Sequence, residues 1–185
     1  MNLGNYIKAH SENIAGAVSL LGSSALMLRG DTKSIAAAIV FTAAELTLAR
    51  YGHTTKGYAA GAVAFAVGDL TLAFSDSVEE GSFLQMTLQG MAAAWAVGAL
   101  RYPFERAAQA TKSLKLQQVA DTLPAICGTA NLALRLPGIF SALAANQKIV
   151  ACAITAWAIS DVLAGRLQER VGSVYRRIRP PTSNL

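Results

Sequence analysis

The sequence predicts an all-α, polytopic integral membrane protein. Of its 185 residues, 53% are hydrophobic and only 15% are charged, whereas a soluble domain usually carries about 25% charged residues. The charges also fall in short clusters between apolar runs of about 16–19 residues, close to the roughly 17–25 residues that cross a bilayer. A soluble Ala-rich bundle is the weaker alternative, because segments 57–68 and 91–100 lack the polar stripe of a surface helix.

We expect six short, Ala/Gly-rich transmembrane helices, at 13–28, 34–50, 57–75, 83–101, 120–136 and 148–165. The first four are separated by RGDTKS, RYGHTTKG and DSVEEGS, which hold residues suited to turns and helix caps. Such short loops force neighbouring helices to be antiparallel. Pro137 and Gly138 should break the fifth helix. Residues 136–147 would then form a bent extension, a re-entrant piece or a seventh membrane segment.

The Lys and Arg residues predict that both termini are cytoplasmic. In that orientation all but four of the 16 Lys and Arg residues lie on the cytoplasmic side, as the positive-inside rule requires. The four exceptions are Arg29, Lys33, Arg135 and Lys148. We therefore expect a multi-pass protein of a bacterial inner membrane. We expect no cleavable signal peptide, since the first apolar run has no small-residue cleavage site.

The chain divides into a transmembrane bundle at 1–166 and a basic cytoplasmic tail at 167–185. Within the bundle, residues 102–119 form a longer cytoplasmic link that should contain a surface helix. The tail carries an amphipathic stretch at 167–179 that could lie on anionic lipid headgroups. Its lipid-facing basic residues are Arg170, Arg176, Arg177 and Arg179. Simple positive-inside anchoring of the last span is the alternative explanation for these arginines.

A short pattern recurs in the predicted helices: a large residue, two further residues, a small one, a polar one and an aliphatic one. It is clearest in FTAAEL at 41–46 and FAVGDL at 65–70. Weaker matches begin at Trp95, Cys127 and Trp157, and a loose one begins at Leu20. We interpret the pattern as a weak single-helix internal repeat, since repeats are common in transporters. Chance similarity in an Ala-rich chain is the alternative.

The polar position of this pattern supplies the candidate ion-binding residues, Glu45, Asp69 and Asp161, with Ser24 and Asn131 as supporting polar groups. A carboxylate near the bilayer centre costs about 2.5–3.5 kcal/mol. No Lys or Arg lies in the central turns of the predicted spans, so the acids are short of internal counter-charge. Arg135 follows Asn131 by four residues and could bond it or reach another helix. Alternating helix directions should place the polar positions in two layers about 10 Å apart. Alternatively, protonated acids join neighbouring helices through hydrogen bonds.

The sequence gives little support for an enzyme. It contains no Walker loop, GxSxG or HExxH motif, and His10 and His53 have no zinc-type spacing. Cys127 and Cys152 lie within apolar runs, where buried thiols are expected. We expect no metal, no cofactor and no nucleic-acid partner, because the basic charge is explained by the membrane face.

The sequence thus favours a small membrane transporter or channel that uses intramembrane carboxylates as proton or cation sites. The alternative is a non-catalytic membrane subunit that scaffolds or anchors a larger complex. An integral membrane enzyme with the acids as acid/base groups is a third class. The expected partners are the lipid bilayer, anionic headgroups at the tail, and either other proteins of a membrane complex or further copies of the chain.

Overall fold

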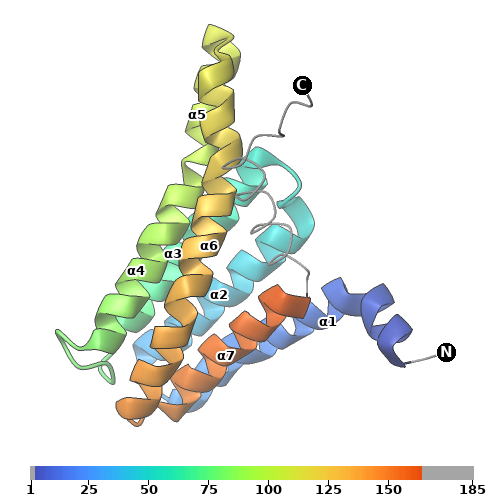
Figure 1. Ribbon diagram of the computed structural model, residues 1–185. Coiled ribbons are helices and arrows are strands. Elements are labelled where there is room, and N and C mark those ends of the chain that lie inside the picture. The colour runs from blue at the N-terminus through green and yellow to red at the C-terminus, as the bar shows by residue number, and fades with distance from the viewer. Residues whose placement is uncertain (1–2, 164–185) are drawn as a thin grey trace, which may run out of the picture.

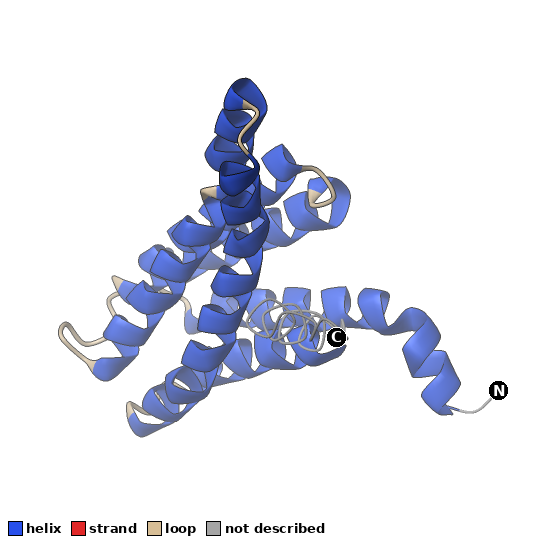
Figure 2. Cartoon of the chain, turned by 45° about the horizontal axis from the view of Figure 1, so that its top comes forward, coloured by secondary structure: helices blue, strands red, loops and turns tan. Residues whose placement is uncertain are grey.

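The computed structural model describes residues 3–163, and this part of the chain contains helices and loops without strands (Figure 2). The helices are α1 (Leu3–Ala25), the short 3₁₀ helix η1 (Leu26–Arg29), α2 (Thr32–Tyr51), α3 (Thr55–Ala73), α4 (Phe83–Ala99), α5 (Arg101–Thr111), α6 (Leu114–Ala144) and α7 (Lys148–Leu163). The all-α fold class is confirmed. The predicted basic tail at 167–185, with Arg170, Arg176, Arg177 and Arg179, lies outside the described residues.

Six of the helices close into a ring. In sequence order α1, α2, α3, α4, α6 and α7 each pack against the next, and α7 packs against α1. Successive helices run in opposite directions along the bundle (Figure 1). α1 and α7 lie side by side and are tilted strongly against α4 and α6. This ring encloses the candidate functional site.

Helix α5 continues in the direction of α4 and packs against the first part of α6. Helices α5 and α6 thus form a hairpin at one end of the bundle (Figure 1). This hairpin corresponds to the link predicted at 102–119, and a helix, α5, is present there. The second half of the link belongs to the first turns of α6. An ordered turn joins the two helices, in which Lys112 has the left-handed backbone conformation at φ 52°.

The predicted break at Pro137 and Gly138 is wrong. α6 is one helix of 31 residues that passes through both Pro124 and Pro137 to Ala144. A proline inside a helix removes one backbone hydrogen bond, but close packing on both sides holds the chain helical. A Cβ added to buried Gly138 would lie 3.3 Å from atoms of both Ile154 and Thr87. Tertiary contacts with α7 and α4 thus outweigh the local preference, and residues 136–147 form no separate segment.

The loop sequences cap the helices as expected. The side chains of Asp31, Thr54 and Ser82 accept hydrogen bonds from backbone N–H groups in the first turns of α2, α3 and α4. These bonds satisfy donors that a helix start otherwise leaves unpaired. The three loops therefore end and begin helices where turn and cap chemistry predicts.

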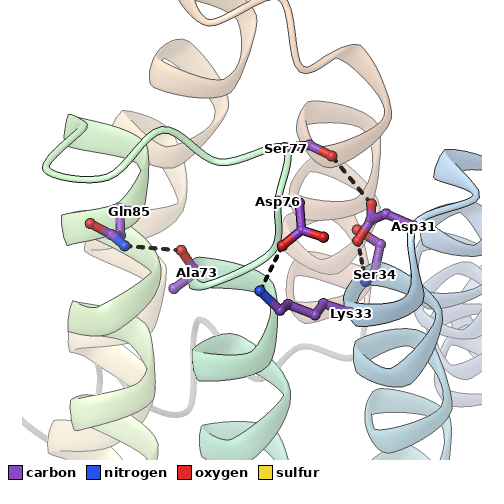
Figure 3. Close-up of polar contacts among 7 residues, drawn as sticks. All are labelled: Asp31, Lys33, Ser34, Ala73, Asp76, Ser77 and Gln85. Atoms are coloured by element: carbon purple, nitrogen blue, oxygen red, sulfur yellow. Dashed lines mark hydrogen bonds and ion pairs between the residues drawn. The ribbon is translucent and has the colours of Figure 1, made fainter.

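Polar contacts join the loops at the other end of the bundle from the α5–α6 hairpin (Figure 3). The Ser77 hydroxyl donates to Asp31 over 3.3 Å, and Lys33 Nζ lies 2.6 Å from Asp76 Oδ1. The Gln147 amide donates to the Ser77 carbonyl oxygen over 2.6 Å. These contacts join three connections of the bundle to one another: η1–α2, α3–α4 and α6–α7.

Three stretches of the described chain are long and apolar enough to cross a membrane: Thr32–Tyr51, Phe83–Thr111 and Leu114–Ala144. The second stretch combines α4 and α5. Length and composition thus support membrane association. The expected number of six spans and their orientation go beyond this finding and stay predictions.

Candidate functional site

A small cavity lies inside the ring, and every one of the six ring helices contributes to its wall. Its lining residues are Ser19, Phe41, Glu45, Leu48, Phe65, Asp69, Met91, Trp95, Arg135, Trp157, Ser160 and Asp161. The cavity has a volume of ≈ 20 Å³, which is room for about one water molecule. It combines several ionisable groups with large aromatic side chains.

The three predicted acids, Glu45, Asp69 and Asp161, all line this one cavity. The helices that carry them are tilted against one another (Figure 1). The prediction of two polar layers concerns the depths of the acids along the bundle, and it stays a prediction.

Asp161 is paired with a buried arginine. Arg135 Nη1 lies 2.9 Å from Asp161 Oδ2, and the two side chains are only 7% and 11% exposed. The expectation that no cation lies at the depth of the acids is therefore wrong for Asp161. It failed because α6 was expected to end at 136, whereas it continues to Ala144 and places Arg135 inside the bundle.

Glu45 lies at the edge of the same cavity. It is partly exposed, and the buried Ser19 hydroxyl of α1 donates a hydrogen bond to its Oε1 atom. Glu45 is in the second half of α2, towards the end at Tyr51. Within α2, Glu45 thus lies nearer to the end of the bundle that carries the α5–α6 hairpin (Figure 1).

Asp69 differs from the other two acids. It is 1% exposed, and neither carboxyl oxygen has a hydrogen-bond partner among the described residues. The other ionisable residues of the cavity wall are Glu45, Asp161 and Arg135. A buried polar group without a hydrogen bond is costly, and a buried charge without close partners more so. Asp69 is thus the least satisfied group of the site.

The two supporting residues do not line the cavity. Asn131 is buried, but its amide donates to the Cys127 carbonyl oxygen of its own helix over 3.1 Å. Ser24 is exposed. Its neighbour Ser23 is buried and accepts a hydrogen bond from Trp157 Nε1 over 3.1 Å.

Sequence reasoning missed Ser19 and Arg135 as parts of the site. Ser19 and Ser23 are four residues apart, so they share one helix face, and this spacing could have identified the inner face of α1. The fifth predicted helix, at 120–136, contains one basic residue, Arg135. The structure places this residue in the cavity wall. Recognising α6 as a longer helix would have assigned it to the interior.

Four aromatic rings form a continuous row along the cavity. The ring centroids of Trp157 and Phe41 are 4.6 Å apart, those of Phe41 and Phe65 are 6.0 Å apart, and those of Phe65 and Trp95 are 4.6 Å apart. These four rings occupy the large position of the sequence pattern. Equivalent positions thus meet in space, whereas duplication of a single-helix unit stays a prediction.

Gly68 fixes the position of this row against α3. A Cβ at Gly68 would lie 2.6 Å from Phe41 Cε1, closer than real carbon atoms approach. The small residue before Asp69 therefore allows the Phe41 ring to pack directly on the α3 backbone. This contact holds the ring beside the acid.

The acids of the site are not grouped as metal ligands. Over the described residues no three His, Cys, Asp or Glu side chains come together in a way that could hold a metal ion. The cavity instead contains the Asp69 carboxyl group without a hydrogen bond, the Arg135–Asp161 ion pair and several aromatic side chains. These groups surround a space that has room for about one water molecule. Such a site can hold a proton or a small monovalent cation.

Fold and site together define a class: a ring of six antiparallel helices with an ionisable interior and stretches that can cross a membrane. Comparison with protein-family models, with curated proteins and with solved structures finds no match.

Proposed function

We propose that this chain is a multi-pass membrane protein that transfers protons or small cations through its six-helix ring. Asp69 is the group that takes up the ion. The observation that carries the proposal is the complete burial of the Asp69 carboxyl group without a hydrogen-bond donor. An apolar residue at this position would avoid the cost of burial, so the acid is explained best by an ion that it binds.

The surroundings of Asp69 fit this role. Acidic residues within membrane helices face the bundle interior and mark ion pathways, and all six helices contribute to the wall around Asp69. The Arg135–Asp161 pair supplies a fixed charge arrangement close by. Glu45, at the partly exposed edge of the cavity, gives an ion a second carboxylate on the way to the bundle end.

The orientation proposed for the chain follows from its charges. The α5–α6 hairpin and Arg50 belong to the side rich in Lys and Arg, which the positive-inside rule assigns to the cytoplasm. Both termini are then cytoplasmic, in a bacterial inner membrane. Glu45 then lies towards the cytoplasmic end of α2. The loops joined by contacts around Asp31 lie on the opposite side of the membrane.

The test is ion flux in proteoliposomes loaded with a pH-sensitive dye and driven by an imposed cation gradient. Wild-type protein should carry ions faster than empty liposomes, and Asp69→Asn should reduce the rate to that of empty liposomes. The matched control is Asp121→Asn, because Asp121 is an exposed acid near the start of α6. Equal rates for wild type and Asp69→Asn contradict the role of Asp69.

The second candidate is a non-catalytic membrane subunit that scaffolds a larger complex. It is favoured by the size of the cavity, since about one water molecule fits into it and the surrounding core is close packed. In that case wild-type protein shows no flux above empty liposomes, and the unsatisfied acid serves a protein partner or a second copy of the chain.

A further inference from the structure

We infer that the ion bound beside Asp69 is a weakly hydrated monovalent cation of about the size of a water molecule, such as K⁺ or ammonium. This inference rests on the proposed function, because it names the substrate class of the same cavity. It is carried by the volume of the cavity, its aromatic wall and the unsatisfied carboxyl group.

The cavity volume limits the size of the ion. A space of ≈ 20 Å³ accepts about one water-sized particle. A larger organic cation does not fit, and neither does an ion that keeps a full shell of water. The ion must therefore enter with most of its hydration removed, which is easiest for a weakly hydrated cation.

The aromatic wall replaces part of the lost hydration. Phe41, Phe65, Trp95 and Trp157 all line the cavity. A cation over an aromatic face is attracted by the negative charge density of the ring, most strongly at Trp, and the attraction increases when water is excluded. Ring faces suit a cation that forms weak, non-directional contacts.

The acids in the wall are not grouped as the ligands of a strongly hydrated divalent ion. Mg²⁺ requires close to six oxygen ligands in octahedral geometry. In the part of the chain that the structure describes, the acids form no cluster of metal-ligand type. The Asp69 carboxyl group supplies the one buried anion that is without a hydrogen bond there, which matches a single positive charge.

The charges around the bound ion come from three helices besides α3. Glu45 faces the cavity from α2, Arg135 from α6 and Asp161 from α7. Arg135 pairs with Asp161 at 2.9 Å, and its charge also acts on Asp69. Three carboxyl groups thus share one arginine around the cavity, and a monovalent cation adds a second positive charge there.

The chain contains a built-in reporter for this binding. It has two tryptophans, and both Trp95 and Trp157 line the cavity. Intrinsic tryptophan fluorescence of the full chain in detergent thus reports on the cavity alone. Titrations with Rb⁺, Na⁺ and Mg²⁺, at an ionic strength held constant with choline, measure the selectivity.

We expect Rb⁺ to change the fluorescence with an affinity at least about tenfold higher than that of Na⁺, because ring faces favour the less hydrated ion. K⁺ and ammonium should compete with Rb⁺, and which of the two competes better identifies the preferred ion. Asp69→Asn should abolish the response. A response to Na⁺ or Mg²⁺ that equals or exceeds the Rb⁺ response overturns the inference.

A second variant separates the ring contribution from general packing. Phe65→Leu keeps an apolar side chain but removes one ring face, so the preference for Rb⁺ over Na⁺ should fall several-fold. Phe74→Leu is the matched control, since Phe74 follows the same helix but is 54% exposed. An unchanged preference in Phe65→Leu contradicts the aromatic contribution.

The two proposals fail in different ways. Proton flux that depends on Asp69, together with no fluorescence response to Rb⁺, keeps the proposed function and overturns the cation inference. Absence of both flux and response overturns both.

Discussion

Two aspartates, Asp31 and Asp69, show opposite uses of the same side chain. Asp31, before the first turn of α2, accepts hydrogen bonds from the Ser34 N–H over 2.8 Å and the Ser77 hydroxyl over 3.3 Å (Figure 3). It also lies 3.6 Å from Arg29 Nε. Asp69 is more deeply buried, yet neither of its oxygens has a hydrogen-bond partner among the described residues.

The difference shows which acid serves stability. The Ser34 N–H donates to Asp31 from the first turn of α2, and the Ser77 hydroxyl joins the start of α2 to the α3–α4 loop, so the acid both caps the helix and links two connections of the bundle end. Asp69 gives up hydration and gains no hydrogen bond in return. A substitution at Asp31 should therefore weaken the fold, whereas one at Asp69 should affect the ion transfer that we propose. The predictions below test this contrast in order of decreasing effect on stability.

The largest loss of stability is expected from breaking the buried ion pair. Arg135→Met should lower the free energy of unfolding by about 3–5 kcal/mol, because it leaves the Asp161 carboxylate buried without this partner. Thermal or denaturant unfolding in detergent measures the change. Arg106→Met is the control, since Arg106 is exposed on α5. A loss as small as in the control would show that the pair does not hold α6 to α7.

The next largest effect is expected where α3 approaches the Phe41 ring. Gly68→Ala introduces a Cβ 2.6 Å from Phe41 Cε1, so the ring or the helix must shift, at a cost of about 1–3 kcal/mol. Gly16→Ala is the matched control, because no atom lies within 4 Å of a Cβ there. The control should be neutral or stabilising by about 0.5–1 kcal/mol through helix propensity. Equal effects of both variants would contradict the close approach.

A smaller and pH-dependent effect is expected at Asp31. Burial alone raises the pKa of Asp31, but the hydrogen bonds from Ser34 and Ser77 and the charge of Arg29 outweigh it, so its pKa is below the ordinary value. Because the folded pKa is lowered, the stabilisation is present above the unfolded pKa of about 3.9 and is lost as pH falls through the folded pKa.

Asp31→Asn should therefore cost about 1–2 kcal/mol at pH 7, with the difference from wild type disappearing at low pH. Melting curves of both proteins between pH 2 and pH 7 measure it. A difference that persists unchanged at the acid end would show that charge is not what Asp31 contributes.

The smallest effect is expected at the exposed pair of Lys33 and Asp76. Its side chains are 50% and 73% exposed, and such surface pairs contribute about 0–1 kcal/mol. Lys33→Met should therefore change the midpoint of unfolding very little, and less in high salt. A loss of stability as large as that of Asp31→Asn would show that the Lys33–Asp76 pair, and not Asp31, holds these loops together.

Much of the fold could be predicted from the sequence because the local signals agree. Apolar runs located the helices of the ring, and the cap residues Asp31, Thr54 and Ser82 located three helix starts. The pattern around Glu45, Asp69 and Asp161 identified acids that share one cavity.

The rest could not be predicted because it depends on tertiary packing. Pro137 and Gly138 carry a strong local signal for a break, and only contacts with Ile154 and Thr87 show why α6 continues. The pairing of Arg135 with Asp161 depends on that continuation. The exposure of Ser24 depends on the rotation of α1, which a loose match to the pattern did not fix.

The most direct test of the central claim compares the melting temperatures of Asp69→Asn and Asp31→Asn with that of the wild type in detergent at pH 7. If Asp69 is kept for ion binding, Asp69→Asn should melt at the wild-type temperature or above it, because the amide removes the cost of a buried, unsatisfied acid. Asp31→Asn should melt lower. A loss in Asp69→Asn as large as that in Asp31→Asn would contradict the account and make Asp69 a structural residue.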